Sequence, residues 1–479
     1  MNAKSISNSD SYAALDAYFE EQMHRFNIPG ASLAIVEGDQ IVHMRGFGRA
    51  QPDGEAPTPQ TPFFIGSLTK SFTALAVMQL VEAGKIELDA PVQRYLPWFG
   101  VADPQASAEM TVRHLLNQTS GLPMLLGMTN LADVDNRPDA AERQVRALSA
   151  LKITRPVGSK FEYSNLNYNV LGLIVEAASG ECYEGYVQQH IFDPLDMSHS
   201  YTSKADAQQD GLAMGHRFWF GVPVAARNLP VPRGSLPAGE LISSAEDIGH
   251  YLIAQLNGGR YRSAQILSGA GIEEMHRPAA EINEMGMSLG HYGMGWISEG
   301  TGASRIVSHS GIVPDFGGFI ALVPGQKKGL VLLFNVNHAM MKMTLDETGM
   351  GAAERLAGRS PAPMRFEAVP WAMRALLLIP LLQIVGVIAT LLLLRQWRHH
   401  PEQRPNGARL WGWHILLPLI PNLSLVALPM LLRAKGMFGF TRFFMPDVAW
   451  IALIGGGFAG IWSILRIGLI LKVIGRRQA

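Results

Sequence analysis

The stretch TPFFIGSLTKSFTALAVMQLVEAGKIELDA, residues 61–90, carries the strongest local signals in this chain. Its apolar residues 63–65 predict a short buried strand, and Gly66 then allows a tight turn. After Ser67 the apolar residues recur with three- and four-residue spacing as far as Gly84, which predicts a buried helix that ends at this glycine. Ser67 therefore lies at the N-terminus of a buried helix.

Ser67 and Lys70 are three residues apart, so their side chains leave the same face of this helix. A serine hydroxyl becomes a good nucleophile only when a base is within hydrogen-bond reach, and a lysine in an apolar pocket can have its pKa lowered enough to be that base. The helix N-terminus adds backbone N–H groups where an oxyanion would form. The pattern S-x-x-K also occurs by chance, with the serine as a helix cap and the lysine on the surface, so other motifs must decide.

Composition excludes several classes of protein. The chain has 479 residues, enough for two or three domains, and its 40 basic and 40 acidic residues give no basic excess for nucleic acid. Cys182 is the only cysteine, which excludes an intrachain disulfide framework, and the 14 histidines show no H-E-x-x-H pattern. We therefore expect no metal site, no cofactor and no nucleic-acid partner.

Strand signals lie near both ends of residues 1–365, and helical signals lie between them. Two β-type runs around Gly38 and Asp39 predict a hairpin, and residues 68–280 are mainly helical apart from a Pro- and Gly-rich loop at 213–242. Further strands are expected at 305–311, 317–324 and 329–337. We predict one antiparallel sheet, built from about residues 30–66 and 304–337, in an α/β domain with a helical part.

Residues 366–479 have a different character, because three long apolar stretches occur at about 375–394, 410–432 and 448–471. The first is twenty residues without a charge, which as a helix spans about 30 Å, the thickness of a bilayer core. The sequence thus predicts an all-α domain of three transmembrane helices and a membrane-lipid environment. The pair Gly456 and Gly460 could let these helices pack closely, so an oligomer formed through them is open.

The charged flanks of these stretches predict their orientation. Arginines gather in the first connector and at the tail: Arg395, Arg398, Arg404, Arg409, Arg476 and Arg477. The positive-inside rule places both segments in the cytoplasm, so residues 1–365 would lie outside, in the periplasm if the membrane is a bacterial inner membrane. Residues 1–10 are polar and lack the apolar core of a signal peptide, so the route of export is open.

Two further motifs change the interpretation of Ser67. Tyr163-Ser164-Asn165 follows a helix break and precedes another helix, so it belongs on a loop. His309-Ser310-Gly311 ends an apolar β-type run and could line one edge of a cleft. The chain therefore carries S-x-x-K, Y-x-N and H-x-G in this order.

This order resembles the serine β-lactamase and penicillin-binding-protein superfamily, most closely its class C, D-aminopeptidase and family VIII esterase members. The resemblance covers about residues 12–345 and implies a penicillin-recognising fold, with an antiparallel sheet and a helical subdomain. It rests on six matches in order: IGSLTK at 65–70, HLLNQTSGLP at 114–123, YSN at 163–165, PAGELIS at 237–243, YGMGW at 292–296 and HSG at 309–311.

The resemblance implies a role for each catalytic residue. Ser67 would be the acylated nucleophile and Lys70 the group that accepts its proton. Tyr163 would be a second base, which protonates the leaving group and activates the deacylating water. A phenol with a pKa of about 10 can act in this way only if cations such as Lys70 lower that pKa.

The remaining site residues would bind the substrate. Asn165 would hold a substrate amide or orient Lys70. His309 stands where many relatives carry the lysine of K-T-G, and a neutral imidazole can donate a hydrogen bond to a carboxylate or carbonyl but has no permanent charge. The oxyanion hole would consist of the backbone N–H groups of Ser67 and of Ile312, just past Gly311.

A catalytic domain followed by three membrane helices is similar in layout to membrane-anchored S12-type peptidases such as the colibactin-maturing peptidase. In such an enzyme, polar side chains are expected just after H-x-G to bind a D-Asn group. This chain has Ile312, Val313 and Asp315 there. The expected activity is cleavage of an amide bond through an acyl-enzyme, in a D-residue-containing or acylated peptide, prodrug activation included. A carboxylesterase and a β-lactamase remain alternatives, and so does an acylated penicillin-binding sensor with little turnover.

Overall fold

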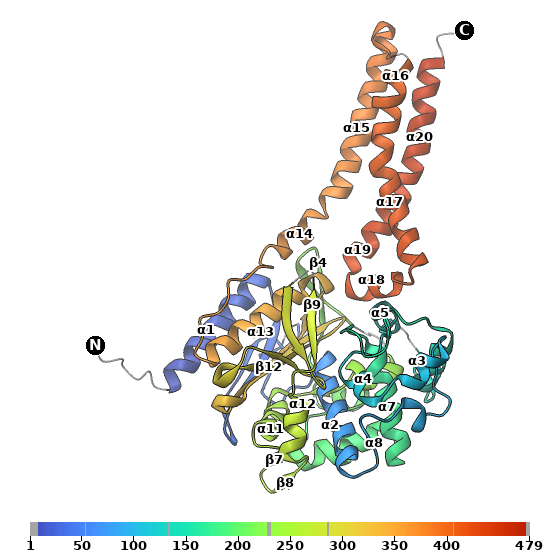
Figure 1. Cartoon of the computed structure of the whole chain (residues 1–479). Coiled ribbons are helices and arrows are strands. Elements are labelled where there is room, and N and C mark those ends of the chain that lie inside the picture. Colours follow the sequence, from blue (N-terminus) through green and yellow to red (C-terminus); the bar gives the residue numbers. More distant parts are fainter. Residues whose placement is uncertain are drawn as a thin grey trace. The chain divides into compact units, whose positions relative to one another are not determined.

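The structure is a computed structural model that describes residues 8–52, 54–132, 135–227, 231–284, 287–405 and 407–475. The chain divides into two compact units, which we call the sheet unit (Met1–Arg217 and Pro223–Glu367) and the helical unit (Phe218–Val222 and Ala368–Ala479). Figure 1 shows the strands of the sheet unit and the long helices of the helical unit. Two predictions concern segments outside the described residues. One is the lack of a signal-peptide core, which involves residues 1–7, and the other is the cytoplasmic tail with Arg476 and Arg477.

An eight-stranded antiparallel sheet organises the sheet unit, in the order β2-β1-β14-β13-β12-β11-β10-β9. The chain's early and late strands join where β1 pairs with β14, in a register that places Ala31 opposite Phe334. The prediction of one antiparallel sheet built from both ends of the domain is therefore confirmed. The strands are β1 Gly30–Glu37, β2 Gln40–Gly48, β9 Ala280–Glu284, β10 Met287–Tyr292, β11 Ile297–Glu299, β12 Ile306–Val313, β13 Phe316–Val323 and β14 Lys328–Phe334.

The central strands read as continuous apolar runs because helices cover both faces of the sheet. Helix α13 (Lys342–Leu356) approaches so closely that a Cβ on Gly349 would lie 2.3 Å from the Phe319 ring. Helix α11 (Ala245–Leu256) lies on the other face, where a Cβ on Gly249 would lie 2.8 Å from Ile41. Figure 1 shows α1 (Asn8–Phe26) beside α13 on the first of these faces.

The helical subdomain is built around α2 (Thr69–Glu82), which is buried along most of its length. Phe72 stacks on Tyr251 with ring centroids 4.1 Å apart, and α2 packs against α7 (Asn165–Ser179) and α10 (Leu236–Gly239). The other helices are α3 Pro104–Glu109, α4 Val112–Leu116, α5 Met124–Asn130, α6 Ala140–Arg146, α8 Tyr183–Val187, α9 Lys204–Gln209 and α12 Gly269–Met275. This core holds the beginning of α2 rigidly against the sheet.

Two sequence predictions about the sheet unit are wrong in part. Residues 213–242 are not only loop, since they contain β4 (His216–Trp219), β5 (Val222–Ala225) and α10. The sheet also extends over β9, β10 and β11, within a region predicted as helical or left unassigned. These strands have three to six residues, too few for a clear alternation of apolar and polar side chains, and only pairing with distant segments makes them strands.

The helical unit holds three helices that are long and apolar enough to cross a membrane: Val369–His399, Gly407–Ala434 and Pro446–Gly475. Polar side chains tie them together, because Arg466 donates hydrogen bonds to Thr390 Oγ1 (3.0 Å) and to the His414 carbonyl oxygen (2.5 Å). A Cβ on Gly456 would lie 2.6 Å from the Leu425 carbonyl oxygen. This glycine therefore lets two helices of the same chain pack closely, while an oligomer formed through them stays a prediction.

Candidate active site

The backbone around Ser67 is held in a turn that only glycine fits. Strand β3 (Phe63–Phe64) is buried, Gly66 has a φ of +56°, and a short 3₁₀ turn leads into α2. A Cβ on Gly66 would lie 2.4 Å from the backbone nitrogen of Ile312 on β12. The turn thus presses the start of α2 against β12 and leaves Ser67 partly exposed between them.

Lys70 is completely buried, with 0% of its surface exposed, and its amine faces three oxygen atoms. Lys70 Nζ lies 2.9 Å from Ser67 Oγ, 2.7 Å from Asn165 Oδ1 and 2.5 Å from the Ala238 carbonyl oxygen. Burial lowers the pKa of Lys70 well below its usual value, and the negative charge of Glu240 opposes this shift only in part.

A neutral Lys70 amine matches these contacts. It has two N–H groups and one lone pair, and the carbonyl oxygens of Asn165 and Ala238 can only accept. If both N–H groups donate to them, the lone pair is left to accept the proton of the Ser67 hydroxyl. The geometry therefore suits a general base that acts on Ser67. Asn165 lies where it orients Lys70, which is one of the two predicted roles.

Tyr163 lies over the same group, with Lys70 Nζ 5.0 Å from its ring centroid. Burial and the neighbouring Tyr292 raise the pKa of Tyr163 well above its usual value, while a hydrogen bond with Ser67 lowers it. This direction is opposite to the predicted one, because desolvation outweighs the favourable groups and Lys70 is itself driven toward its neutral form. The phenol stays protonated and is suited to donate its proton and to regain it, rather than to act as a standing base.

His309 lies on β12 and is 3% exposed. Burial and the charges of Lys70 and Lys342 lower its pKa to about 3, so the imidazole is neutral near pH 7. Its Nδ1 lies 2.7 Å from the Ser310 carbonyl oxygen, which can only accept, so this nitrogen carries the proton. With this tautomer Nε2 is an acceptor toward Tyr292, 3.4 Å away. Donation of a hydrogen bond by the ring to a substrate requires the other tautomer and stays a prediction.

Gly311 brings the two proposed oxyanion donors together. A Cβ at this position would lie 2.2 Å from the Ile65 carbonyl oxygen and 2.8 Å from the backbone nitrogen of Ser67. The backbone of β12 therefore runs directly against the turn that carries the nucleophile. The N–H groups of Ser67 and Ile312 lie at this contact, as the resemblance implies.

The sequence did not single out Lys342, although it lies at the edge of this site. Its Nζ donates a hydrogen bond to Ser310 Oγ (3.3 Å) and forms an ion pair with Asp346. No motif could reveal it, because it comes from the start of α13, far along the chain from β12. Among the described residues, no three His, Cys, Asp or Glu side chains lie close enough together to hold a metal ion.

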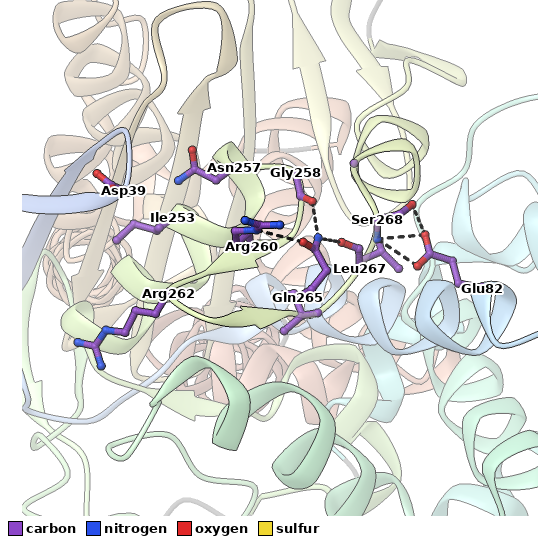
Figure 2. Close-up of a pocket in the computed structure, with 12 residues that line it drawn as sticks. Asp39, Glu82, Ile253, Asn257, Gly258, Arg260, Arg262, Gln265, Leu267 and Ser268 are labelled. Atoms are coloured by element: carbon purple, nitrogen blue, oxygen red, sulfur yellow. Dashed lines mark hydrogen bonds between the residues drawn. The ribbon is translucent and has the colours of Figure 1, made fainter.

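A cavity of about 870 Å³ lies away from these residues, between α2 and α11 and the β7–β8 hairpin (Arg260–Tyr261 and Ala264–Gln265). Figure 2 shows that its polar side chains already bind one another: Glu82 accepts from Ser268, and Gln265 donates to the carbonyl oxygens of Gly258 and Leu267. None of the predicted site residues lines it. We therefore assign the candidate active site to the region around Ser67.

Comparisons with known proteins identify related chains. The β-lactamase family pattern matches residues 15–354. Protein flp of Staphylococcus aureus strain MW2 is 30% identical over 335 residues, which are 69% of this chain and 64% of that protein. Unguisins hydrolase ungD' of Aspergillus campestris is 28% identical over 350 residues, 69% of this chain and 63% of that one. The chain thus spans less than two thirds of the length of these curated relatives.

Solved structures share the fold of the sheet unit. The octameric penicillin-binding protein homologue from Pyrococcus abyssi is 30% identical, with a TM-score of 0.62, over 74% of this chain and 79% of that chain. SurE is 25% identical, with a TM-score of 0.60 over the same shares of the two chains, and has also been solved with D-Leu.

Proposed function

Because this chain belongs to the β-lactamase family, we propose that it is a membrane-anchored serine hydrolase that cleaves an amide bond through an acyl-enzyme on Ser67. The observation that carries this proposal is the position of Lys70. Its buried amine lies 2.9 Å from Ser67 Oγ, and two carbonyl oxygens take up its N–H groups. This arrangement places a base within hydrogen-bond reach of the serine, which is what a serine nucleophile needs.

In the acylation step, Lys70 accepts the proton of Ser67 while Ser67 Oγ attacks the carbonyl carbon of the substrate. The N–H groups of Ser67 and Ile312 stabilise the oxyanion. The Tyr163 hydroxyl donates its proton to the leaving nitrogen and regains one from the protonated Lys70, so that the C–N bond breaks and an ester on Ser67 remains. Water then attacks this ester, its proton passes through the same two groups, and Ser67 is restored.

We propose a peptide that contains a D-residue, or an acylated peptide, as the substrate. Two relatives support this choice, since one is named a hydrolase of unguisins and SurE has been solved with D-Leu. Prodrug activation would be one use of such cleavage. A carboxylesterase, a β-lactamase and a slowly deacylating penicillin-binding sensor are the other outcomes that the experiment below separates.

The proposed location is a bacterial inner membrane, with the sheet unit on the periplasmic side. The three long apolar helices support anchoring. The orientation rests on the arginines of the first connector, among them Arg395, Arg398 and Arg404, which favour the cytoplasmic side. Protease treatment of spheroplasts should cleave the sheet unit; protection of this unit would contradict the proposed orientation.

The test uses the purified full chain in detergent micelles. Intact mass after treatment with a fluorophosphonate should show one adduct on the wild type and none on Ser67→Ala. The control Ser159→Ala, which removes an exposed serine outside the site, should form the same adduct as the wild type. An adduct that survives in Ser67→Ala, or a wild type that forms none, contradicts the proposal. Turnover of acyl-D-amino-acid amides, p-nitrophenyl esters and a cephalosporin then separates peptidase, esterase and β-lactamase, and an adduct without turnover indicates the sensor.

A further inference from the structure

A second cavity, of about 420 Å³, lies within the sheet unit. Its walls include the apolar side chains of Phe64, Val313 and Phe316. Two carboxyl groups also line it, those of Glu240 and Asp315, which are only 5% and 6% exposed. The mechanism proposed above gives neither carboxyl a role.

In the part of the chain that the structure describes, neither carboxyl forms a hydrogen bond with another side chain. Among the described residues, no donor forms a hydrogen bond with the Glu240 carboxyl, and that of Asp315 accepts only from its own backbone N–H. Asp315 is also fixed in place, because a Cβ on Gly215 would lie 2.6 Å from its Oδ2. Buried carboxyls normally have hydrogen-bond partners, since burial without them is costly. Two such groups facing one cavity therefore suit a ligand that donates hydrogen bonds.

Segments that line the cavity also pass close to the nucleophile. Glu240 follows Gly239, and a Cβ on Gly239 would lie 3.7 Å from the carbonyl carbon of Gly66 and 3.9 Å from the Ser67 nitrogen. On the other side, Val313 follows Ile312, whose N–H is a proposed oxyanion donor. Two segments that line this cavity therefore also run past the proposed oxyanion contact.

The acidic and basic residues that line the cavity differ in their exposure. The two acids are buried, whereas Lys204 is half-buried and Arg227 is exposed. Lys204 acts electrostatically on both acids, Arg217 acts on Asp315 and Lys70 acts on Glu240. A ligand that suits this arrangement brings several N–H donors to the bottom and tolerates cations near the entrance. A primary ammonium group on a short apolar stem meets both conditions.

We propose that this cavity is a substrate subsite for an ammonium group, which donates hydrogen bonds to Glu240 and Asp315 while the scissile carbonyl lies at Ser67. This inference rests on the proposed function and narrows it: the substrate has a free amine rather than an acylated one. The amine is either the α-amine of the first residue or the side-chain amine of a lysine-like residue, since both offer the same three N–H donors.

The titration of the two acids agrees with this role. Burial raises the pKa of Asp315 to about 7, and burial together with the neighbouring Asp315 raises the pKa of Glu240 well above its usual value. Without a ligand the pair therefore keeps protons near neutral pH. An ammonium ion favours the ionised carboxyls, so its binding releases protons and weakens as the pH falls below about 7.

The test measures binding by calorimetry to the full-length Ser67→Ala protein in detergent micelles, where no turnover interferes. D-alaninamide carries a free α-amine, N-acetyl-D-alaninamide carries none, and Nα-acetyl-D-lysinamide carries only a side-chain amine. We expect at least one amine probe to bind tenfold or more tightly than N-acetyl-D-alaninamide, and the better of the two identifies the source of the ammonium group. Equal binding of all three, or no binding, would overturn the proposal.

Variants assign the preference to the cavity. Asp315→Asn and Glu240→Gln, added to Ser67→Ala, keep the shape of the side chain and should each remove most of the tenfold preference. Glu273→Gln, at an exposed acid on α12, should leave it intact. If either Asp315→Asn or Glu240→Gln folds and still binds the amine probe tenfold more tightly than N-acetyl-D-alaninamide, the subsite is contradicted. A fluorophosphonate adduct on wild-type Ser67 alongside such a result would leave the hydrolase intact and reject the subsite alone.

Discussion

Lys70 Nζ lies 2.9 Å from Ser67 Oγ, and the lysine side chain is completely buried. Two other oxygens, of Asn165 and Ala238, occupy the remaining hydrogen-bond positions of the amine. Burial stabilises the neutral amine, and if its two N–H groups donate to the two carbonyl oxygens, its lone pair faces the serine. The pair is therefore arranged for proton transfer before a substrate binds.

Lys70→Met should lower the rate of acylation by about 10²–10⁴-fold, because it removes the base without changing the length of the side chain much. The measurement is the rate of fluorophosphonate adduct formation on the full chain. Lys85→Met replaces an exposed lysine just beyond α2 and should react like the wild type. Equal acylation of wild type and Lys70→Met would contradict the role of Lys70.

The pH profile of acylation should rise as Lys70 loses its proton, since only the neutral amine can accept the proton of Ser67. The pKa of Lys70 is well below its usual value, so this rise falls below the range of an ordinary lysine. Asn165→Asp places a carboxylate where Oδ1 now lies 2.7 Å from Nζ, which favours the ammonium form. The rise should then move to higher pH, and an unmoved profile would contradict the assignment of this limb to Lys70.

Buried His309 should make the sheet unit sensitive to acid. Its pKa is about 3 in the folded chain and about 6.5 when the chain is unfolded, so the unfolded state binds a proton first. The free energy of unfolding therefore decreases, on the order of a few kcal/mol, as the pH falls from about 6.5 toward about 3. His309→Gln should reduce the acid dependence of thermal unfolding, and an identical pH dependence in the variant would contradict this.

Gly311→Ala should destabilise the sheet unit and abolish acylation together, because its Cβ would lie 2.2 Å from the Ile65 carbonyl oxygen and force β12 away from Ser67. Steric conflicts of this kind cost about 1–3 kcal/mol or more. Gly269→Ala, where the added Cβ meets only the Gly258 Cα at 4.0 Å, is the matched control. Thermal unfolding and fluorophosphonate labelling measure both effects, and a normally active Gly311→Ala would refute the close contact.

Arg466→Met should loosen the three long helices, since this guanidinium donates to Thr390 on one helix and to His414 on another. Interhelical hydrogen bonds in membranes contribute about 0.6–2 kcal/mol each. Arg442→Met removes an exposed arginine of the same unit and is the control. In mixed micelles, unfolding of the full chain should begin at a lower fraction of denaturing detergent for Arg466→Met than for Arg442→Met. Identical unfolding curves would contradict a stabilising role of the Arg466 hydrogen bonds.

Local sequence was sufficient for much of the fold and for the first part of the site. The apolar periodicity after Ser67 predicted α2. The continuous apolar runs at 317–324 and 329–337 predicted β13 and β14, because a strand that is buried on both faces consists almost entirely of apolar residues. The three long apolar stretches were equally clear. Ser67, Lys70, Tyr163, Asn165 and His309 could be selected because the motifs that contain them are short and local.

Tertiary structure alone decided what these residues experience. Desolvation by segments that are distant in the sequence raises the pKa of Tyr163, against expectation, and lowers the pKa of His309 to about 3. Short strands such as β4 exist only because a remote partner supplies their hydrogen bonds. Glu240 and Asp315 are 75 residues apart in the sequence and face one cavity only after the chain has folded.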